Sequence, residues 1–110
     1  MSDTDRAAIE AEIADLDAFK LGLEREIKDL DRQIKEARRA AMAAGTLEEK
    51  LIGQKRVRAL ESQRSQKRRA LFDAQDEVDR QRDRLIADIE AKLRQTVNVE
   101  EGFVVEWSLS

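Results

Sequence analysis

The chain has 110 residues, of which 41% are charged and 41% hydrophobic, with 4% aromatic residues, no proline and a formal net charge of −3. This composition favours a long-helix or coiled-coil protein over a compact mixed domain, and the length limits the chain to one domain. The absence of cysteine excludes disulfides and thiolate metal sites, and the absence of histidine removes the commonest metal ligand and general base. We therefore expect no metal site, no cofactor and no catalytic residue.

The sequence has neither the pattern of a membrane span nor that of a secretion signal. No apolar run approaches the roughly 18 residues that a span requires, and no basic-then-apolar leader follows Met1. We therefore expect a cytoplasmic protein with no membrane partner.

A seven-residue pattern covers the first part of the chain. The acidic residues Asp3 and Asp5, with Thr4 between them, offer an N-cap and suit the positive end of a helix dipole. Apolar residues then recur with 4-3 spacing, interrupted by charge only at Lys20. The series consists of Ile9, Ile13, Leu16, Lys20, Leu23, Ile27, Leu30, Ile34, Ala37, Ala41 and Ala44. It predicts a helix over about 4–44 with one face packed as a coiled-coil seam.

The small residues that end this series predict a chain reversal at Gly45. Glycine suits the left-handed end of a helix, and Thr46 followed three residues later by Glu49 is the pattern of a capping box at the start of another. A second helix over about 47–95 follows, weakened only by Gly53. The two helices predict an antiparallel coiled-coil hairpin over residues 1–96.

The register of this hairpin follows from the tight turn. If Ala44 faces Leu47, residues that face each other have numbers that add up to roughly 91. This places Ile34 near Val57, Leu30 near Leu60 and Ile13 near Val78. Over 71–93 the apolar residues fit an 11-residue period better than a seven-residue one, which predicts a nearly straight segment.

The second helix covers part of the first one poorly in this register. Arg64 and Lys67 face the apolar surface formed by Leu23 and Ile27. Two arrangements are compatible with this mismatch: the long basic stems cover the surface, or a second hairpin packs there to make a four-helix bundle. The second arrangement, together with the C-terminal segment described next, predicts a homodimer.

The pattern changes from helical to alternating at the C-terminus. Its apolar positions are Phe103, Val105, Trp107 and Leu109. Alternation of this kind predicts a short β-strand or β-hairpin over 97–110, so the predicted fold class is all-α with a C-terminal β-segment. One or two strands cannot bury an aromatic face alone, so we expect these four residues to dock on a partner, on a second copy or on the helical overhang.

Positive charge gathers near the predicted turn. Residues 32–69 contain twelve Lys and Arg against four acidic residues, a net charge of +8, and the rest of the chain has a net charge of −11. Folding back places the basic residues of both helices at one end of a rod, which favours contact with a phosphate backbone. The candidate residues, here called the basic set, are Arg38, Arg39, Lys55, Arg56, Arg58, Arg64, Lys67, Arg68 and Arg69.

The basic set is also compatible with two roles that involve no nucleic acid. It could form a solvated face of the rod, or it could dock on an acidic protein surface. No aromatic residue lies among the basic residues to stack on bases, so a nucleic acid would be contacted through its backbone. The pattern therefore does not distinguish DNA from RNA as the ligand.

The run from Thr46 to Gln95, followed by FVVEW, resembles the C-terminal helical segment of bacterial Swi/Snf-type helicase-like ATPases, including members from phage-defence and restriction islands. The likeness covers roughly residues 36–107, and its most specific part is LFDAQDEVDRQRDRLI. The resemblance implies an accessory coiled coil that docks on a larger DNA-translocating motor.

Both ATPase lobes are missing from these 110 residues, and no phosphate-binding loop or nucleophile motif occurs. We therefore predict a non-enzymatic accessory module of a helicase-like, DNA-acting and anti-phage system. The alternative is a self-assembly or protein-docking coiled coil without a nucleic-acid role.

Overall fold

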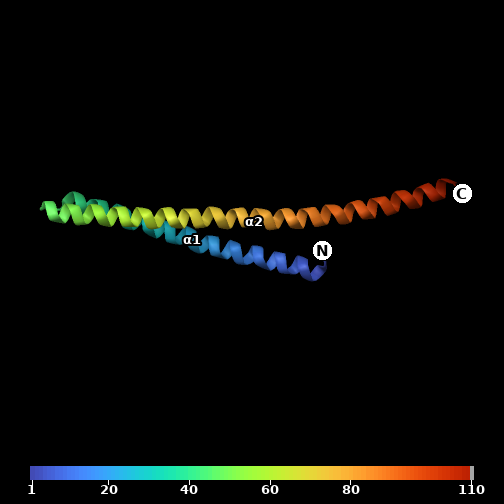
Figure 1. Cartoon of the computed structure of the whole chain (residues 1–110), viewed down its shortest axis with the longest axis horizontal. Coiled ribbons are helices and arrows are strands. Elements are labelled where there is room, and N and C mark those ends of the chain that lie inside the picture. The colour runs from blue at the N-terminus through green and yellow to red at the C-terminus, as the bar shows by residue number, and fades with distance from the viewer. Residues whose placement is uncertain (110) are drawn as a thin grey trace.

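The computed structural model describes the backbone of residues 1–109 and the side chains of residues 1–97. The described chain forms α1 (Asp3–Ala43) and α2 (Leu47–Leu109), which run antiparallel and cross near the turn (Figure 1). The 63 residues of α2 span about 95 Å at about 1.5 Å per residue. This accounts for the longest dimension of 96 Å and for the overhang beyond the N-terminus. The predicted all-helical hairpin is confirmed.

The N-cap of α1 is Ser2, one residue before the predicted acidic cluster. The Ser2 hydroxyl accepts a hydrogen bond from the Asp5 amide at 3.1 Å, and the Asp5 carboxylate accepts one from the Ser2 amide at 3.3 Å. This reciprocal pair is a capping box, which satisfies two amides that the first turn leaves free.

The turn between the helices differs from the prediction at Gly45. No glycine in the described backbone has a positive φ, and the chain instead leaves α1 through an extended Ala44 with φ −62° and ψ 132°. The capping interaction of Thr46 is present, because its hydroxyl accepts from the Glu49 amide at 3.2 Å. The Glu49 carboxylate accepts a hydrogen bond from the Gly45 amide at 3.3 Å, which holds the backbone of the residue before the Thr46 cap in place.

The register of the hairpin is shifted by about three residues from the predicted one. Contacts between the helices join Arg6 to Asp88, Lys20 to Gln75, Arg64 to Asp31 and Ala41 to Gly53. The residue numbers in these pairs add up to about 94, so the predicted register of roughly 91 is wrong by nearly one helical turn. The buried cluster that results contains Leu30, Ile34, Ala37 and Leu60, with Val57 packed against it.

The seam of α2 keeps the seven-residue period throughout the paired region. Its inward positions are Gly53, Val57, Leu60, Arg64, Lys67, Leu71, Ala74, Val78, Gln81, Leu85 and Asp88, all buried or half-buried. The predicted 11-residue period over 71–93 is therefore wrong. Polar residues occupy inward positions such as Gln81 and Asp88, so the apolar residues alone do not display the 4-3 spacing.

The β-segment predicted for 97–110 is not found. The backbone of α2 remains helical through Leu109, and Ser110 lies outside the described residues. A strand needs a neighbouring strand for its amides and carbonyls, whereas a helix satisfies them within its own segment, and a two-helix hairpin offers no sheet edge. The side chains of the predicted docking residues lie outside the described part of the chain, so that prediction stays open. They are Phe103, Val105, Trp107 and Leu109.

The close approach of the helices near the turn generates a prediction for Gly53. A β-carbon added there would lie 2.8 Å from the β-carbon of Ala41 and 3.1 Å from its α-carbon, so the helices would have to separate. Overpacking of this kind typically costs about 1–3 kcal/mol, which exceeds the gain of about 1 kcal/mol in helix propensity. We expect Gly53→Ala to lower Tm in thermal denaturation followed by circular dichroism.

Gly22→Ala is the matched control, because a β-carbon at that position meets no atom within 4 Å. The same substitution should raise stability there by about 0.5–1 kcal/mol through helix propensity alone. Equal stabilisation by both substitutions would contradict a close contact at Gly53.

Candidate nucleic-acid interface

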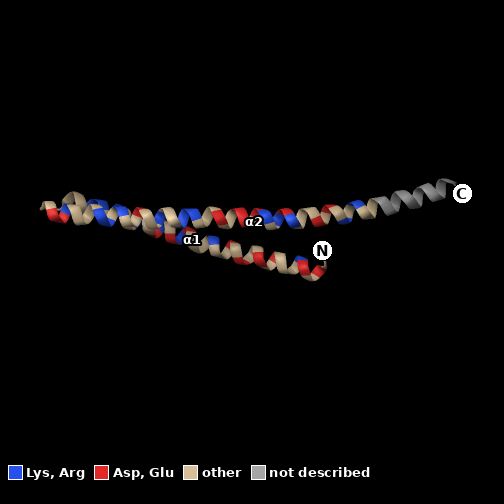
Figure 2. Cartoon of the chain, viewed as in Figure 1, with Lys and Arg blue, Asp and Glu red and all other residues tan. Residues whose placement is uncertain are grey.

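The basic set lies on both helices in the half of the hairpin near the turn (Figure 2). Arg38 and Arg39 belong to the last turns of α1, and the other seven residues belong to α2. Heptad packing fixes the rotation of each helix, so the rigid hairpin determines which of these side chains face the seam and which face solvent.

Three members of the basic set form ion pairs between the helices. Arg38 contacts Glu61, Arg64 contacts Asp31, and Lys67 contacts Glu26, each with a nitrogen–oxygen distance of 2.8 Å. We call these three basic residues the paired set. Their charges are partly neutralised by carboxylates of the same hairpin.

The shift in register brings Leu71 opposite Leu23, while Arg64 and Lys67 remain at inward positions of the seam. Both residues are half-buried at inward positions, and the Arg64 Nε atom is buried without a hydrogen-bond partner in the described part of the chain. Leu23 is only 4% exposed, and in the observed register it is level with Leu71. The long aliphatic stems therefore bury apolar surface while the charged ends reach carboxylates on α1.

The remaining six members of the basic set are exposed and form no ion pair with any side chain that the structure describes. We call them the unpaired set: Arg39, Lys55, Arg56, Arg58, Arg68 and Arg69. Lys55 and Arg69 are two heptads apart and so lie on one side of α2, whereas Arg68 lines a groove between the helices. The unpaired charges are therefore distributed around the rod and do not form one flat patch.

Two aspartates form ion pairs between the helices, Asp31 in the half near the turn and Asp88 at the open end. The hydrogen bond from Arg64 lowers the pKa of the Asp31 carboxyl below its usual range. At the open end, the hydrogen bond from Arg6 at 2.8 Å lowers the pKa of Asp88, whose side chain is only 10% exposed. Both carboxyl groups therefore stay charged in the folded chain at neutral pH.

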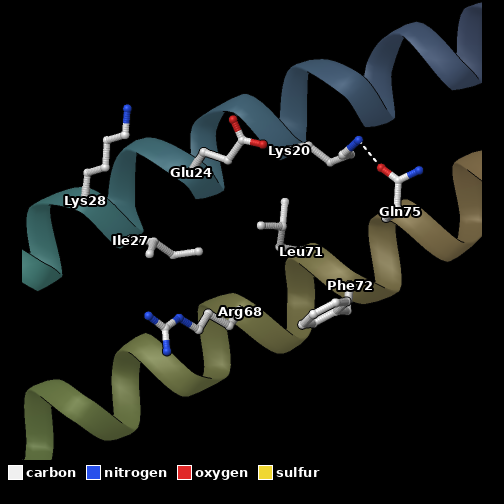
Figure 3. Close-up of a pocket in the computed structure, with 8 residues that line it drawn as sticks. All are labelled: Lys20, Glu24, Ile27, Lys28, Arg68, Leu71, Phe72 and Gln75. Atoms are coloured by element: carbon white, nitrogen blue, oxygen red, sulfur yellow. Dashed lines mark hydrogen bonds between the residues drawn. The ribbon is translucent and has the colours of Figure 1, made fainter.

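A groove of about 570 Å³ lies between the helices near the middle of α1. We call it the central groove; it is lined by Lys20, Glu24, Ile27, Lys28, Arg68, Leu71, Phe72 and Gln75. Figure 3 shows Ile27 and Leu71 between the helices and a hydrogen bond that Lys20 donates to Gln75 across the groove. The sequence-based prediction did not single out Phe72, although its spacing of three heptads from both Leu51 and Leu93 is visible in the sequence.

The described residues contain no group of three or more acidic side chains that could hold a metal ion. Over the same part of the chain, neither helix combines the length and apolar character that crossing a membrane requires.

Comparison of the chain with protein-family models, with curated proteins and with solved structures gave no match. The interpretation of the basic set therefore depends on its charge and geometry.

The lowered pKa values generate a prediction for acid stability. The stabilisation by Asp31 and Asp88 is fully present above the unfolded pKa of about 3.9, and it is lost as the pH falls through the lower folded values. We expect Tm to fall from about pH 5 downward, measured by circular dichroism. Asp88→Asn should flatten this dependence, since the substituted side chain no longer titrates.

Asp73→Asn is the control, because Asp73 is exposed and forms no ion pair with the described side chains. An acid transition that is identical in the original chain and in Asp88→Asn would contradict a role for the Arg6 pair.

Proposed function

We propose that the chain is a non-enzymatic coiled-coil module that contacts the phosphate backbone of a nucleic acid through the unpaired set. The observation that supports this most directly is the group of six exposed cationic side chains without carboxylate partners among the described residues. All six lie within residues 32–69, a segment with a net charge of +8. A surface of this kind attracts polyanions and releases their condensed counterions on binding.

The contact would be largely independent of sequence. Arg and Lys side chains that reach phosphates position a protein without distinguishing bases, and residues 32–69 include no aromatic side chain to stack on bases. The distribution of the unpaired set around the rod suits contact with phosphates from more than one side.

The resemblance to helicase-like ATPases extends the proposal to a biological setting. In this setting the hairpin is an accessory module of a DNA-translocating motor, in an anti-phage system, and its basic half helps to hold the DNA. The C-terminal residues Phe103, Val105, Trp107 and Leu109 would then dock on the motor through their apolar side chains.

Two triple variants with the same change in charge test the proposal. Lys55→Gln, Arg56→Gln and Arg69→Gln remove three unpaired charges, and Arg38→Gln, Arg64→Gln and Lys67→Gln remove the paired set. Binding of labelled duplex DNA is measured by fluorescence anisotropy over a series of salt concentrations. Three lost phosphate contacts should reduce the slope of log affinity against log salt by about 2.7.

The paired-set variant should lower Tm but change the salt slope much less, because its side chains already contact carboxylates. Equal losses of slope in both variants would show that net charge alone attracts DNA. No binding by the original chain at low salt would favour the self-assembly alternative.

A further inference from the structure

One face of α2 displays a row of exposed apolar residues outside the seam. Leu51, Phe72 and Leu93 are 49%, 72% and 60% exposed, and each is separated from the next by 21 residues, or three heptads. Between them the same heptad position is occupied by Arg58, Ser65, Asp79 and the exposed Ile86. The seam follows the same seven-residue period, so residues at this spacing stay on one side of the hairpin along its length. Phe72 lines the central groove, which places the row on the groove face.

Further exposed apolar residues fall close to the three members of this row. They are Met42 and Leu47 near Leu51, Leu21 near the central groove, and Ile86 and Ile89 near Leu93. The groove face therefore has three apolar clusters, one at the turn, one in the middle and one at the open end. The middle cluster lies at equal distance from the other two.

We propose that two copies of this chain pack antiparallel through the groove face, with a two-fold axis at Phe72. A two-fold interface brings the same surface of each copy together, so an apolar pattern that is symmetric about one point suits it. Phe72 then meets its counterpart, and Leu51 of each copy meets Leu93 of the other. The interface is that of a four-helix bundle in which each hairpin contributes two helices.

The charges on α1 match the same axis. In the observed register, Phe72 is level with residue 22 of α1. A two-fold axis at that level brings Lys28 of one copy opposite Asp17 of the other, and Lys35 opposite Glu10. The positions of each pair along the rod agree to within about one residue. Lys28, Lys35 and Glu10 are exposed and form no ion pair with described side chains, and Asp17 has only a 3.9 Å contact with Lys20. The basic half of each copy thus covers the acidic half of the other.

The face is large enough for a stable dimer. From Leu51 to Leu93 the row extends about 63 Å. A contact of this length across both helices buries on the order of 1,000 Å² of surface on each copy, compared with about 800 Å² per partner in standard interfaces. The dimer would leave most of the unpaired set accessible. Arg39, Lys55, Arg56 and Arg69 line neither the central groove nor the groove beside Met42, whereas Arg68 lines the first groove and Arg58 the second.

Disulfide cross-linking tests the orientation, because the natural sequence has no cysteine. Under mild oxidation of the full chain, Phe72→Cys should form a covalent dimer with itself. Leu51→Cys alone and Leu93→Cys alone should not, since their counterparts lie about 60 Å apart, but an equimolar mixture of these two variants should. Ile52→Cys, exposed but outside the row, measures random collisions.

A charge exchange tests the proposed pairs independently of the cysteines. One variant has Lys28→Glu and Lys35→Glu, and the other has Glu10→Lys and Asp17→Lys. Sedimentation equilibrium should show a dimer for the original chain, a monomer of 12.6 kDa or a weakened dimer for each variant alone, and a dimer for their mixture. A monomeric original chain at tens of micromolar, self-cross-linking of Leu51→Cys, or variants that dimerise equally well alone and mixed would each overturn the proposal.

Discussion

The contact between Ala41 and the bare backbone of Gly53 determines how far the two helices slide past each other. Near a turn of this length the helices approach closely only where one of them has no side chain, so the position of Gly53 selects one register. Every contact farther along the rod follows from it, because two helices with a seven-residue seam keep the same offset throughout. The Arg6–Asp88 pair at the other end lies at the same offset.

The seam combines a thin apolar core with polar residues, several of which have defined hydrogen-bond or ion-pair partners. Ile34 and Val78 are its most deeply buried large side chains, and Gln81 is buried among them. The Gln81 side chain accepts a hydrogen bond from Arg84 and donates one to Glu77, so its amide is hydrogen-bonded within α2. These partners lie on the same helix as Gln81, so they satisfy its buried amide without selecting a register between α1 and α2. A hairpin built in this way gains from an additional apolar contact surface.

The asymmetric charge of the hairpin is the common physical basis of both proposals. The half near the turn attracts negatively charged partners. A phosphate backbone and the acidic half of a second copy are both partners of this kind. The two contacts use largely different sides of the rod and share Arg58 and Arg68. Lys28 and Lys35 accompany the apolar groove face, whereas Lys55 and Arg69 lie away from it. An antiparallel dimer would present Arg39, Lys55, Arg56 and Arg69 at each of its two ends.

The sequence by itself determined the two helices, the reversal near Gly45, the seam of α1 and the separation of charge, because these depend on local periodicity, capping and composition. It did not determine the register, since apolar matches exist at offsets one turn apart, and the Ala41–Gly53 approach and the interhelical ion pairs form at only one of them. The seven-residue period of α2 was hidden by Gln81 and Asp88 for a related reason: their burial follows from their position opposite α1, not from their own polarity. The division of the basic set into paired and unpaired residues was likewise decided by the tertiary structure, because an ion pair depends on which carboxylate lies across the seam.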